Sequence, residues 1–211
     1  MLDHYKTVSG YGSAALDINK SRFIAYVSRV ETEDEAVAFI EQIKKKHLDA
    51  THHCAAYITG EHDQYQKAYD DGEPTGTAGK PILEVIKKSA LKDTVIVVIR
   101  YFGGIKLGSG GLIRAYGRAA SAGLQVAGFI ERCCHTRIVM EFDYTFQGIV
   151  ENNLRSLGYV IEGKEFGERV TMIALEKSGQ EEILEKKITD WTAGKAILSR
   201  AGEVYVDGIV T

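Results

Sequence analysis

Hydrophobic positions near the start of the chain follow two spacings, one typical of strands and one typical of helices. Residues 21–28 alternate and are rich in aromatic and β-branched side chains, which predicts a strand. A helix is predicted after it, because Thr32 and Glu35 form a capping box ahead of apolar residues at helical spacing. Two further strands, joined by a polar turn, are predicted at residues 51–59 and 64–69.

Two glycine-rich segments each lead into a predicted helix. The first, residues 70–79, precedes a helix with Pro81 in its first turn. Residues 94–101 form a continuous apolar run, which predicts a central strand buried on both faces. The second glycine-rich segment, residues 103–111, opens a helix at residues 112–127. Interior glycines are costly in a helix, so we expect this backbone to lie very close to the sheet.

The pattern starts again after about residue 135. Strand, helix, strand, strand, helix and strand are predicted at residues 137–144, 146–157, 159–165, 169–176, 183–191 and 203–207. In the first of these strands, Ile138, Met140, Phe142 and Tyr144 are expected to share one face. The order βαββαβ is the ferredoxin-like arrangement. We therefore predict an α+β protein of two domains, residues 1–134 and 135–211.

Composition adds few constraints. The 211 residues are 45% hydrophobic and 26% charged, which is ordinary for a packed globular protein. No apolar run approaches the roughly 20 residues needed to span a bilayer, and the polar start does not resemble a signal peptide. Cys54, Cys133 and Cys134 lack the spacing of a disulfide framework or a zinc site, so reduced thiols are expected. These features favour a cytoplasmic protein without membrane contact.

Charge is distributed unevenly. The formal net charge of −3 does not indicate nucleic-acid binding. Residues 74–118, however, contain only Glu84 and Asp93 against eight basic residues, and this local excess favours an anionic partner. The eight are Lys80, Lys87, Lys88, Lys92, Arg100, Lys106, Arg114 and Arg118.

The two glycine-rich segments are the main candidates for a functional site. Each runs into a helix N-terminus, where free backbone N–H groups and the helix dipole suit a phosphate or carboxylate. The cations proposed for this site are Lys80, Arg100, Lys106, Arg114 and Arg118. The proposed backbone contributors are Gly76, Gly79, Gly103, Gly104, Gly108, Gly110 and Gly111. In the alternative interpretation, the glycines serve tight turns and the arginines bond to carbonyl groups or acidic side chains.

Two histidines and three carboxylates accompany the loops. His52 and His53 are neighbours on a predicted strand, so they face opposite ways and do not both ligate one metal. One of them is expected near the loops, as a phosphate contact, a base contact or a general base. Asp70, Asp71 and Glu73 are candidates for a divalent ion or for acid–base work, but an acidic turn is the simpler interpretation. We predict neither a resident metal nor a catalytic group.

Nucleotide-cofactor motifs are absent from the sequence. A P-loop ending at Gly79 and Lys80 would need glycine at position 74 and Ser or Thr at position 81, and both positions are proline. The glycines at 108–111 lack the spacing of a dinucleotide-binding loop. No cofactor is therefore predicted.

The composite of both loops resembles a known family. Residues 70–81 (DDGEPTGTAGKP) and 98–116 (VIRYFGGIKLGSGGLIRAY) are similar to the signature of the IMPACT family, also called YigZ-type, and the resemblance extends over roughly residues 17–127. The remainder, from about His135, resembles the smaller C-terminal domain of bacterial members. The resemblance implies a first domain like domain 2 of ribosomal protein S5 and a ferredoxin-like second domain. Together these are similar to the fourth and fifth domains of elongation factor G.

The resemblance also implies a link to translation. Eukaryotic relatives influence initiation by binding the activator of a stress-responsive kinase. They carry an additional N-terminal interaction domain that is not expected here, so this partner is not transferred. Fold similarity alone is a weak guide to function.

Three functions remain open from the sequence. The leading hypothesis is a non-enzymatic, translation-linked regulator that binds structured RNA or the ribosome through the basic loops, with His52 or His53 nearby. Since no RNP-type aromatic pair is present, it would recognise shape and backbone, and no DNA sequence specificity is expected. The second hypothesis is a regulator that binds a protein partner. The third is an enzyme acting on a phosphorylated or nucleotide substrate, with Asp71 or Glu73 and His52 as acid and base.

Overall fold

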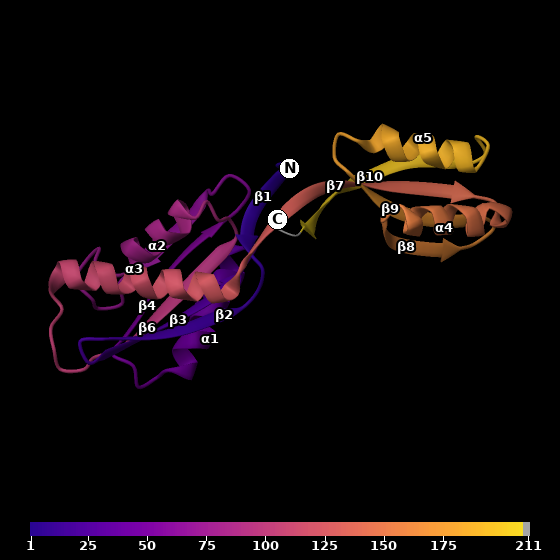
Figure 1. Ribbon diagram of the computed structural model, residues 1–211. Helices are drawn as coiled ribbons and strands as arrows, with labels where there is room; N and C mark the ends of the chain where they lie inside the picture. Colours follow the sequence, from indigo (N-terminus) through magenta and orange to yellow (C-terminus); the bar gives the residue numbers. More distant parts are fainter. Residues whose placement is uncertain (209–211) are drawn as a thin grey trace. The chain divides into compact units, whose positions relative to one another are not determined.

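The computed structural model describes residues 1–208, which form two compact units (Figure 1). The N-terminal unit is Tyr5–Glu131, and the C-terminal unit combines Met1–His4 with Arg132–Gly208. Each unit packs helices on a β-sheet, so the predicted α+β class is confirmed. None of the helices in the described chain is both long and apolar enough to cross a bilayer.

The N-terminal unit is built on a five-stranded antiparallel sheet. Across the sheet the strands are β2 (Gly12–Ile18), β3 (Ser21–Arg29), β6 (Thr94–Tyr101), β4 (His52–Thr59) and β5 (Tyr65–Tyr69). The central strand β6 has apolar side chains in the core on both faces, as its continuous hydrophobic run predicted. Strand β2 was not predicted, because its small side chains alternate weakly and it lies at an edge of the sheet.

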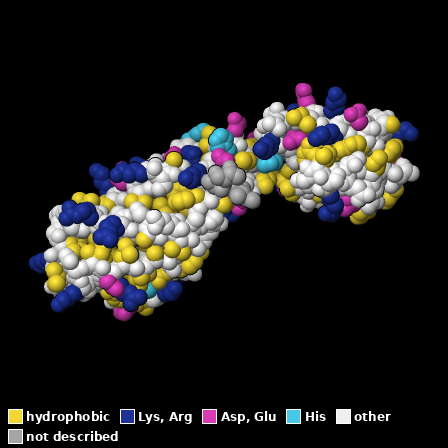
Figure 2. All heavy atoms as spheres, viewed as in Figure 1, with side chains coloured by type: hydrophobic (Ala, Val, Ile, Leu, Met, Phe, Trp, Pro, Cys, Tyr) yellow, Lys and Arg dark blue, Asp and Glu magenta, His cyan; other side chains and the backbone are white. Residues whose placement is uncertain are grey.

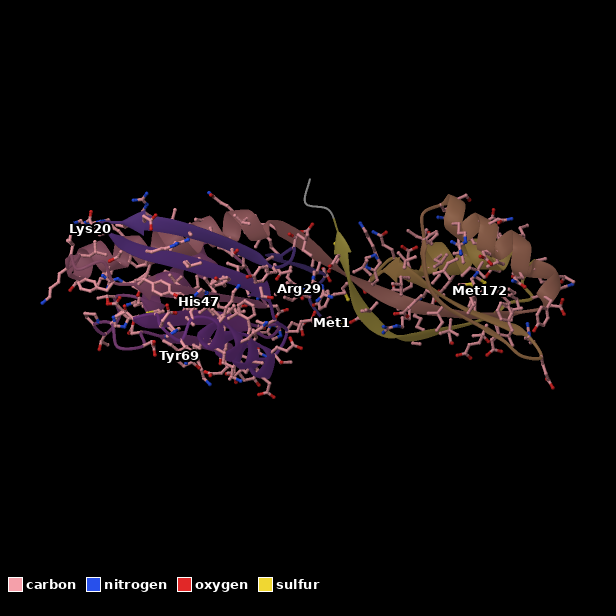
Figure 3. All side chains as sticks on the ribbon, turned by 90° about the horizontal axis from the view of Figure 1, so that it is seen from below. Met1, Lys20, Arg29, His47, Tyr69 and Met172 are labelled. Atoms are coloured by element: carbon pink, nitrogen blue, oxygen red, sulfur yellow. The ribbon has the colours of Figure 1, made fainter. Side chains whose placement is uncertain are left out.

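Helices cover both faces of this sheet. Helix α1 (Glu33–Lys46) packs on one face, and α2 (Gly79–Lys88) and α3 (Gly108–Ala127) pack on the other. The Thr32 half of the predicted capping box is present at α1, where the Glu35 N–H donates to Thr32 Oγ1 at 3.2 Å. The Glu35 carboxylate instead accepts the N–H of Glu31, one residue before the cap, at 2.7 Å. His47, labelled in Figure 3, follows the last residue of α1, and its ring lies between the hydroxyls of Tyr26 and Tyr101.

Helix α3 approaches the sheet closely at one of its glycines. A Cβ on Gly123 would lie 2.9 Å from Val27 Cγ2 and 3.0 Å from Ala25 Cβ, so the expected close approach is confirmed there. Gly117 differs, since a Cβ at that position would have no neighbour within 4 Å. These two interior glycines of α3 therefore serve different purposes.

The C-terminal unit has the predicted βαββαβ order. Its elements are β7 (Phe129–Phe142), which begins in the N-terminal unit, α4 (Gln147–Ser156), β8 (Val160–Phe166), β9 (Val170–Lys177), α5 (Glu181–Trp191) and β10 (Ile197–Gly208). Strand β9 pairs with β7 and β8, and β10 pairs with β7, as in a ferredoxin-like sheet. Met172, labelled in Figure 3, lies in the core beneath α4 and α5.

Further details of the described chain differ from the sequence pattern. Tyr144 does not continue the strand, because Asp143 caps a short 3₁₀ helix, η1 (Tyr144–Phe146), by accepting the Thr145 N–H at 2.9 Å. Strand β1 (His4–Val8) was not predicted and pairs with β7. The first residues extend this pairing, since Cys134 N–H donates to Asp3 O at 2.8 Å.

The two interior glycines of α3 give a paired test of packing. Gly117→Ala should stabilise the protein by about 1 kcal/mol, because alanine is the better helix former and the space is open. Gly123→Ala should be less stable than Gly117→Ala by about 2 kcal/mol, since its methyl group meets Ala25 and Val27. Urea denaturation of both variants measures the difference, and equal stability would contradict the close approach of α3.

Candidate functional site

The first glycine-rich loop closes around its own carboxylate. Asp70 Oδ2 accepts the Gly76 N–H at 2.7 Å, and Oδ1 accepts the N–H groups of Ala78 at 3.1 Å and Gly79 at 2.9 Å. Burial alone would raise the pKa of Asp70, but these three donors outweigh it and hold the pKa below its ordinary value. The N-terminus of α2, where an external anion was predicted, is thus already neutralised from within the chain.

A buried ion pair fixes the next part of this loop. Glu73 Oε1 accepts from Arg100 Nη1 at 2.6 Å and from the Tyr116 hydroxyl at 2.7 Å. The two charged side chains are only 3% and 5% exposed. Arg100 therefore serves as the counterion of Glu73, where the sequence suggested an exposed phosphate contact. Its guanidinium carbon also lies 5.4 Å and 5.3 Å from the ring centroids of Phe23 and Phe102.

The adjacent histidines lie on opposite faces of β4. His52 Nδ1 is 2.8 Å from Asp71 O, and a carbonyl only accepts, so Nδ1 carries the proton and Nε2 faces Glu73 at 3.8 Å. His53 instead contacts the Asp71 carboxylate at 3.2 Å and His47 O at 2.7 Å. Of the two acid–base pairs considered from the sequence, Asp71 with His52 is not assembled, because the Asp71 carboxylate faces the other histidine. Glu73 does lie beside His52, but the same carboxylate oxygen is bonded to Arg100 and Tyr116.

Two further buried groups complete this network. Cys54 Sγ lies 3.0 Å from Asp70 O and 3.3 Å from the Tyr116 hydroxyl. Burial raises the pKa of Cys54 to about 12, so the thiol remains protonated and is a poor nucleophile at neutral pH. Burial likewise raises the pKa of Tyr116, which keeps its hydroxyl available as a donor to Glu73. Neither residue was singled out as part of the site from the sequence.

A cavity opens beside this network at the start of α3. We call it the α3 cavity; its volume is about 430 Å³, and its lining includes Glu73, Arg100, His52, Lys106 and Ser109. The remaining wall is largely apolar and includes Pro74, Phe102, Leu107 and Leu112. Of the side chains predicted to bind an anion, Lys106 and His52 line this cavity together with Arg100, and the predicted loop residue Gly108 also lies in the lining.

The other predicted cations lie along a separate groove. Two adjoining depressions between α2 and α3 share Val85, Lys88, Ile113 and Gly117, and together they form what we call the α2–α3 groove. Basic side chains line it from both helices. Figure 2 shows Lys and Arg side chains interspersed with apolar ones on the N-terminal unit. Those lining the groove are Lys80 and Lys88 from α2 and Arg114 and Arg118 from α3. The predicted cations thus divide between the groove and the α3 cavity.

The predicted loop glycines have identifiable backbone roles. Gly76, Gly104 and Gly108 have φ values of 77°, 85° and 70°, in the left-handed region that favours glycine. A Cβ on Gly79 would lie 2.6 Å from Tyr69 N, and one on Gly103 would lie 1.9 Å from Lys20 O. Gly110 and Gly111 lie in the first turn of α3; a Cβ on Gly111 would lie 3.1 Å from Leu107 Cβ, whereas one on Gly110 would have room. Most of these glycines are therefore explained by turns and close packing.

Carboxylates and histidines of the loops do not converge on one point. Within residues 1–208, no group of three or more His, Cys, Asp or Glu side chains is arranged to hold a metal ion. Asp70, Asp71 and Glu73 each bind a different partner in the protein.

Comparison with known proteins identifies the family. Residues 19–124 match the model of the Impact N-terminal domain, and residues 140–195 match a domain of unknown function, DUF1949. The chain belongs to the IMPACT family. The resemblance of the two loop motifs is thereby confirmed.

Relatives of this IMPACT family member match it over different lengths. The family member YvyE of Bacillus subtilis is 46% identical over 210 residues, covering 100% of this chain and 97% of that protein. YigZ of Escherichia coli is 44% identical over 111 residues, covering 52% of this chain and 54% of its own. A crystal structure described as that of a hypothetical protein has a TM-score of 0.64 at 29% identity and covers 94% of this chain and 97% of its own.

The Asp70 cap predicts a pH dependence of stability. Its folded pKa is depressed, so its contribution is present above the ordinary aspartate pKa and is lost as the pH falls through the folded pKa. Asp70→Asn should cost about 2 kcal/mol at neutral pH and show a smaller loss of stability on acidification. Denaturation at a series of pH values measures both, with Asp17→Asn, an exposed carboxylate on β2, as control. Equal pH profiles for wild type and Asp70→Asn would contradict the cap.

The buried ion pair predicts strong coupling between its partners. Glu73→Gln should destabilise the protein by about 3–5 kcal/mol, because it leaves the Arg100 charge buried without a counterion. Arg100→Met added to Glu73→Gln should recover part of this loss, since the unpaired charge is removed. Chemical denaturation of the single and double variants measures the coupling. If the double variant is less stable than Glu73→Gln, the charge pair is not the interaction that stabilises this loop.

Proposed function

We propose that this IMPACT family member is a non-enzymatic, translation-linked factor whose N-terminal unit binds structured RNA along the α2–α3 groove. The observation that carries the proposal is a set of uncompensated cations around an apolar floor. Of the eight basic residues between positions 74 and 118, Lys92 pairs with Asp63 at 2.7 Å and Arg100 pairs with Glu73. Among the described residues, the other six form no ion pair, and four of them line the groove.

The spacing of these cations suits a backbone reader. Arg114 and Arg118 are one turn apart on α3, about 6 Å along the axis, and Lys80 and Lys88 span about 12 Å of α2. Rows of cations on two neighbouring helices favour contact with successive phosphates. Glu84 is the carboxylate that lines the groove beside them, so the local field remains positive.

The floor of the groove supports the same proposal. Val85, Pro81 and Ile113 are apolar, and Gly117 leaves the space between the helices open. No aromatic side chain lines the groove in the described part of the chain, which favours contact with backbone and shape over base stacking. A charge-neutral protein partner would leave the four cations unpaired, whereas phosphates would compensate them.

Binding of a structured RNA across a salt series tests the proposal. The logarithm of the affinity should fall linearly with the logarithm of the salt concentration. Arg114→Glu combined with Arg118→Glu should weaken binding at low salt and reduce the magnitude of this slope by about two, because each arginine would bind one phosphate. Fluorescence anisotropy with labelled RNA, followed by sedimentation with ribosomes, measures both quantities.

A matched control separates a local effect from net charge. Lys177→Glu with Lys186→Glu makes the same change in charge at exposed positions of the C-terminal unit, and RNA affinity should be retained. Equal weakening by the two double variants would contradict the groove as the binding site. Absence of RNA binding by the wild-type protein at low salt would instead favour a protein partner.

A further inference from the structure

The helices that follow the two glycine-rich loops differ in how their N-termini are capped. At α2, the chain supplies its own anion, because Asp70 accepts the N–H groups of Ala78 and Gly79. At α3, within the described residues, no side chain caps the first turn. The free N–H groups and the positive end of the α3 dipole therefore lie at the edge of the α3 cavity.

The cavity itself carries an incompletely satisfied charged group. Arg100 is 4% exposed and lines the cavity, and its Nε has no hydrogen-bond partner in the described structure, although Nη1 and Nη2 bind Glu73 and Ser21. The charge of Glu73 is already compensated by Arg100, so Lys106 contributes a net positive charge to the cavity. Among the described residues, Arg100 thus has one donor without a partner although its charge is compensated, and the exposed Lys106 supplies the positive charge that favours an anionic ligand.

We propose that the α3 cavity binds the phosphate group of a small phosphate monoester that has an aromatic or other apolar body. The donors at this end are the N–H groups of the first turn, the Ser109 hydroxyl and Lys106 Nζ. They outnumber the two oxygens of a carboxylate and match the three terminal oxygens of a phosphate. The opposite wall, with Phe102, Pro74 and Leu112, would cover the apolar body, and 430 Å³ suits a ligand of nucleotide size or smaller.

His52 is a further polar residue of the lining and would help to orient the ligand. His52 Nδ1 donates to Asp71 O, and Nε2 lies 3.8 Å from Glu73 Oε1 in the lining of the cavity. A polar group on the body of the ligand would hydrogen-bond to Nε2. This small-molecule site goes beyond RNA binding in the α2–α3 groove, because it uses different side chains and a different ligand.

Phenyl phosphate is a suitable probe, since it combines both parts of the proposed ligand. Calorimetric titration of the whole chain at low salt should give saturable binding, with a dissociation constant of about 1 mM or tighter. Lys106→Ala should weaken this affinity about tenfold, whereas Lys80→Ala, which removes the same charge from the groove, should leave it unchanged. Phe102→Ala should weaken binding of phenyl phosphate but leave that of inorganic phosphate unchanged.

Backbone amide resonances give an independent readout that does not depend on any variant. Phenyl phosphate should shift the amide signals of Ser109, Gly110 and Gly111, while those of Ala78 and Gly79, already bonded to Asp70, should stay in place. No saturable binding, equal weakening by Lys106→Ala and Lys80→Ala, or tighter binding of benzoate than of phenyl phosphate would each overturn the proposal. Arg114→Glu with Arg118→Glu should retain phenyl phosphate binding, which separates this result from the RNA test.

Discussion

The ion pair between Glu73 and Arg100 is the interaction on which the site region depends. It joins the first glycine-rich loop to the central strand β6 and, through the Tyr116 hydroxyl, to helix α3. Two charges removed from water are stable only when their geometry is good and their remaining bonds are satisfied. The pair therefore couples three elements that are distant in sequence, and its two side chains form part of the cavity wall.

This arrangement also explains the sequence of the first loop. Asp70 holds the turn by its three backbone donors, Glu73 turns inward to Arg100, and Asp71 turns outward to His53. Three acidic residues in four positions thus perform three separate structural tasks. The acidic loop resembles a catalytic or metal-binding motif in sequence, yet its carboxylates are occupied by the protein itself.

Much of the fold was accessible from local sequence patterns. The capping box at Thr32 and the apolar run of β6 act over a few residues, so their structural consequences are visible in the sequence. The environment of the Arg100 side chain could not be predicted in this way. An arginine at the end of a strand gives the same local pattern whether its side chain is exposed to solvent or paired with a glutamate 27 positions earlier. Which of His52 and His53 faces the cavity likewise depends on strand register, which the sequence alone did not define.

The C-terminal unit contains residues from both ends of the described chain. Leu2 N–H donates to the Tyr205 hydroxyl at 2.9 Å across 203 positions, and Asp3 O accepts the Cys134 N–H. Closing a loop of this length is entropically costly and slow compared with local contacts. This part of the sheet should therefore form late in folding, after the N-terminal unit has its own core. A fragment starting at Arg132 would lack these partners. The complete C-terminal unit therefore cannot be obtained as one continuous fragment of the chain.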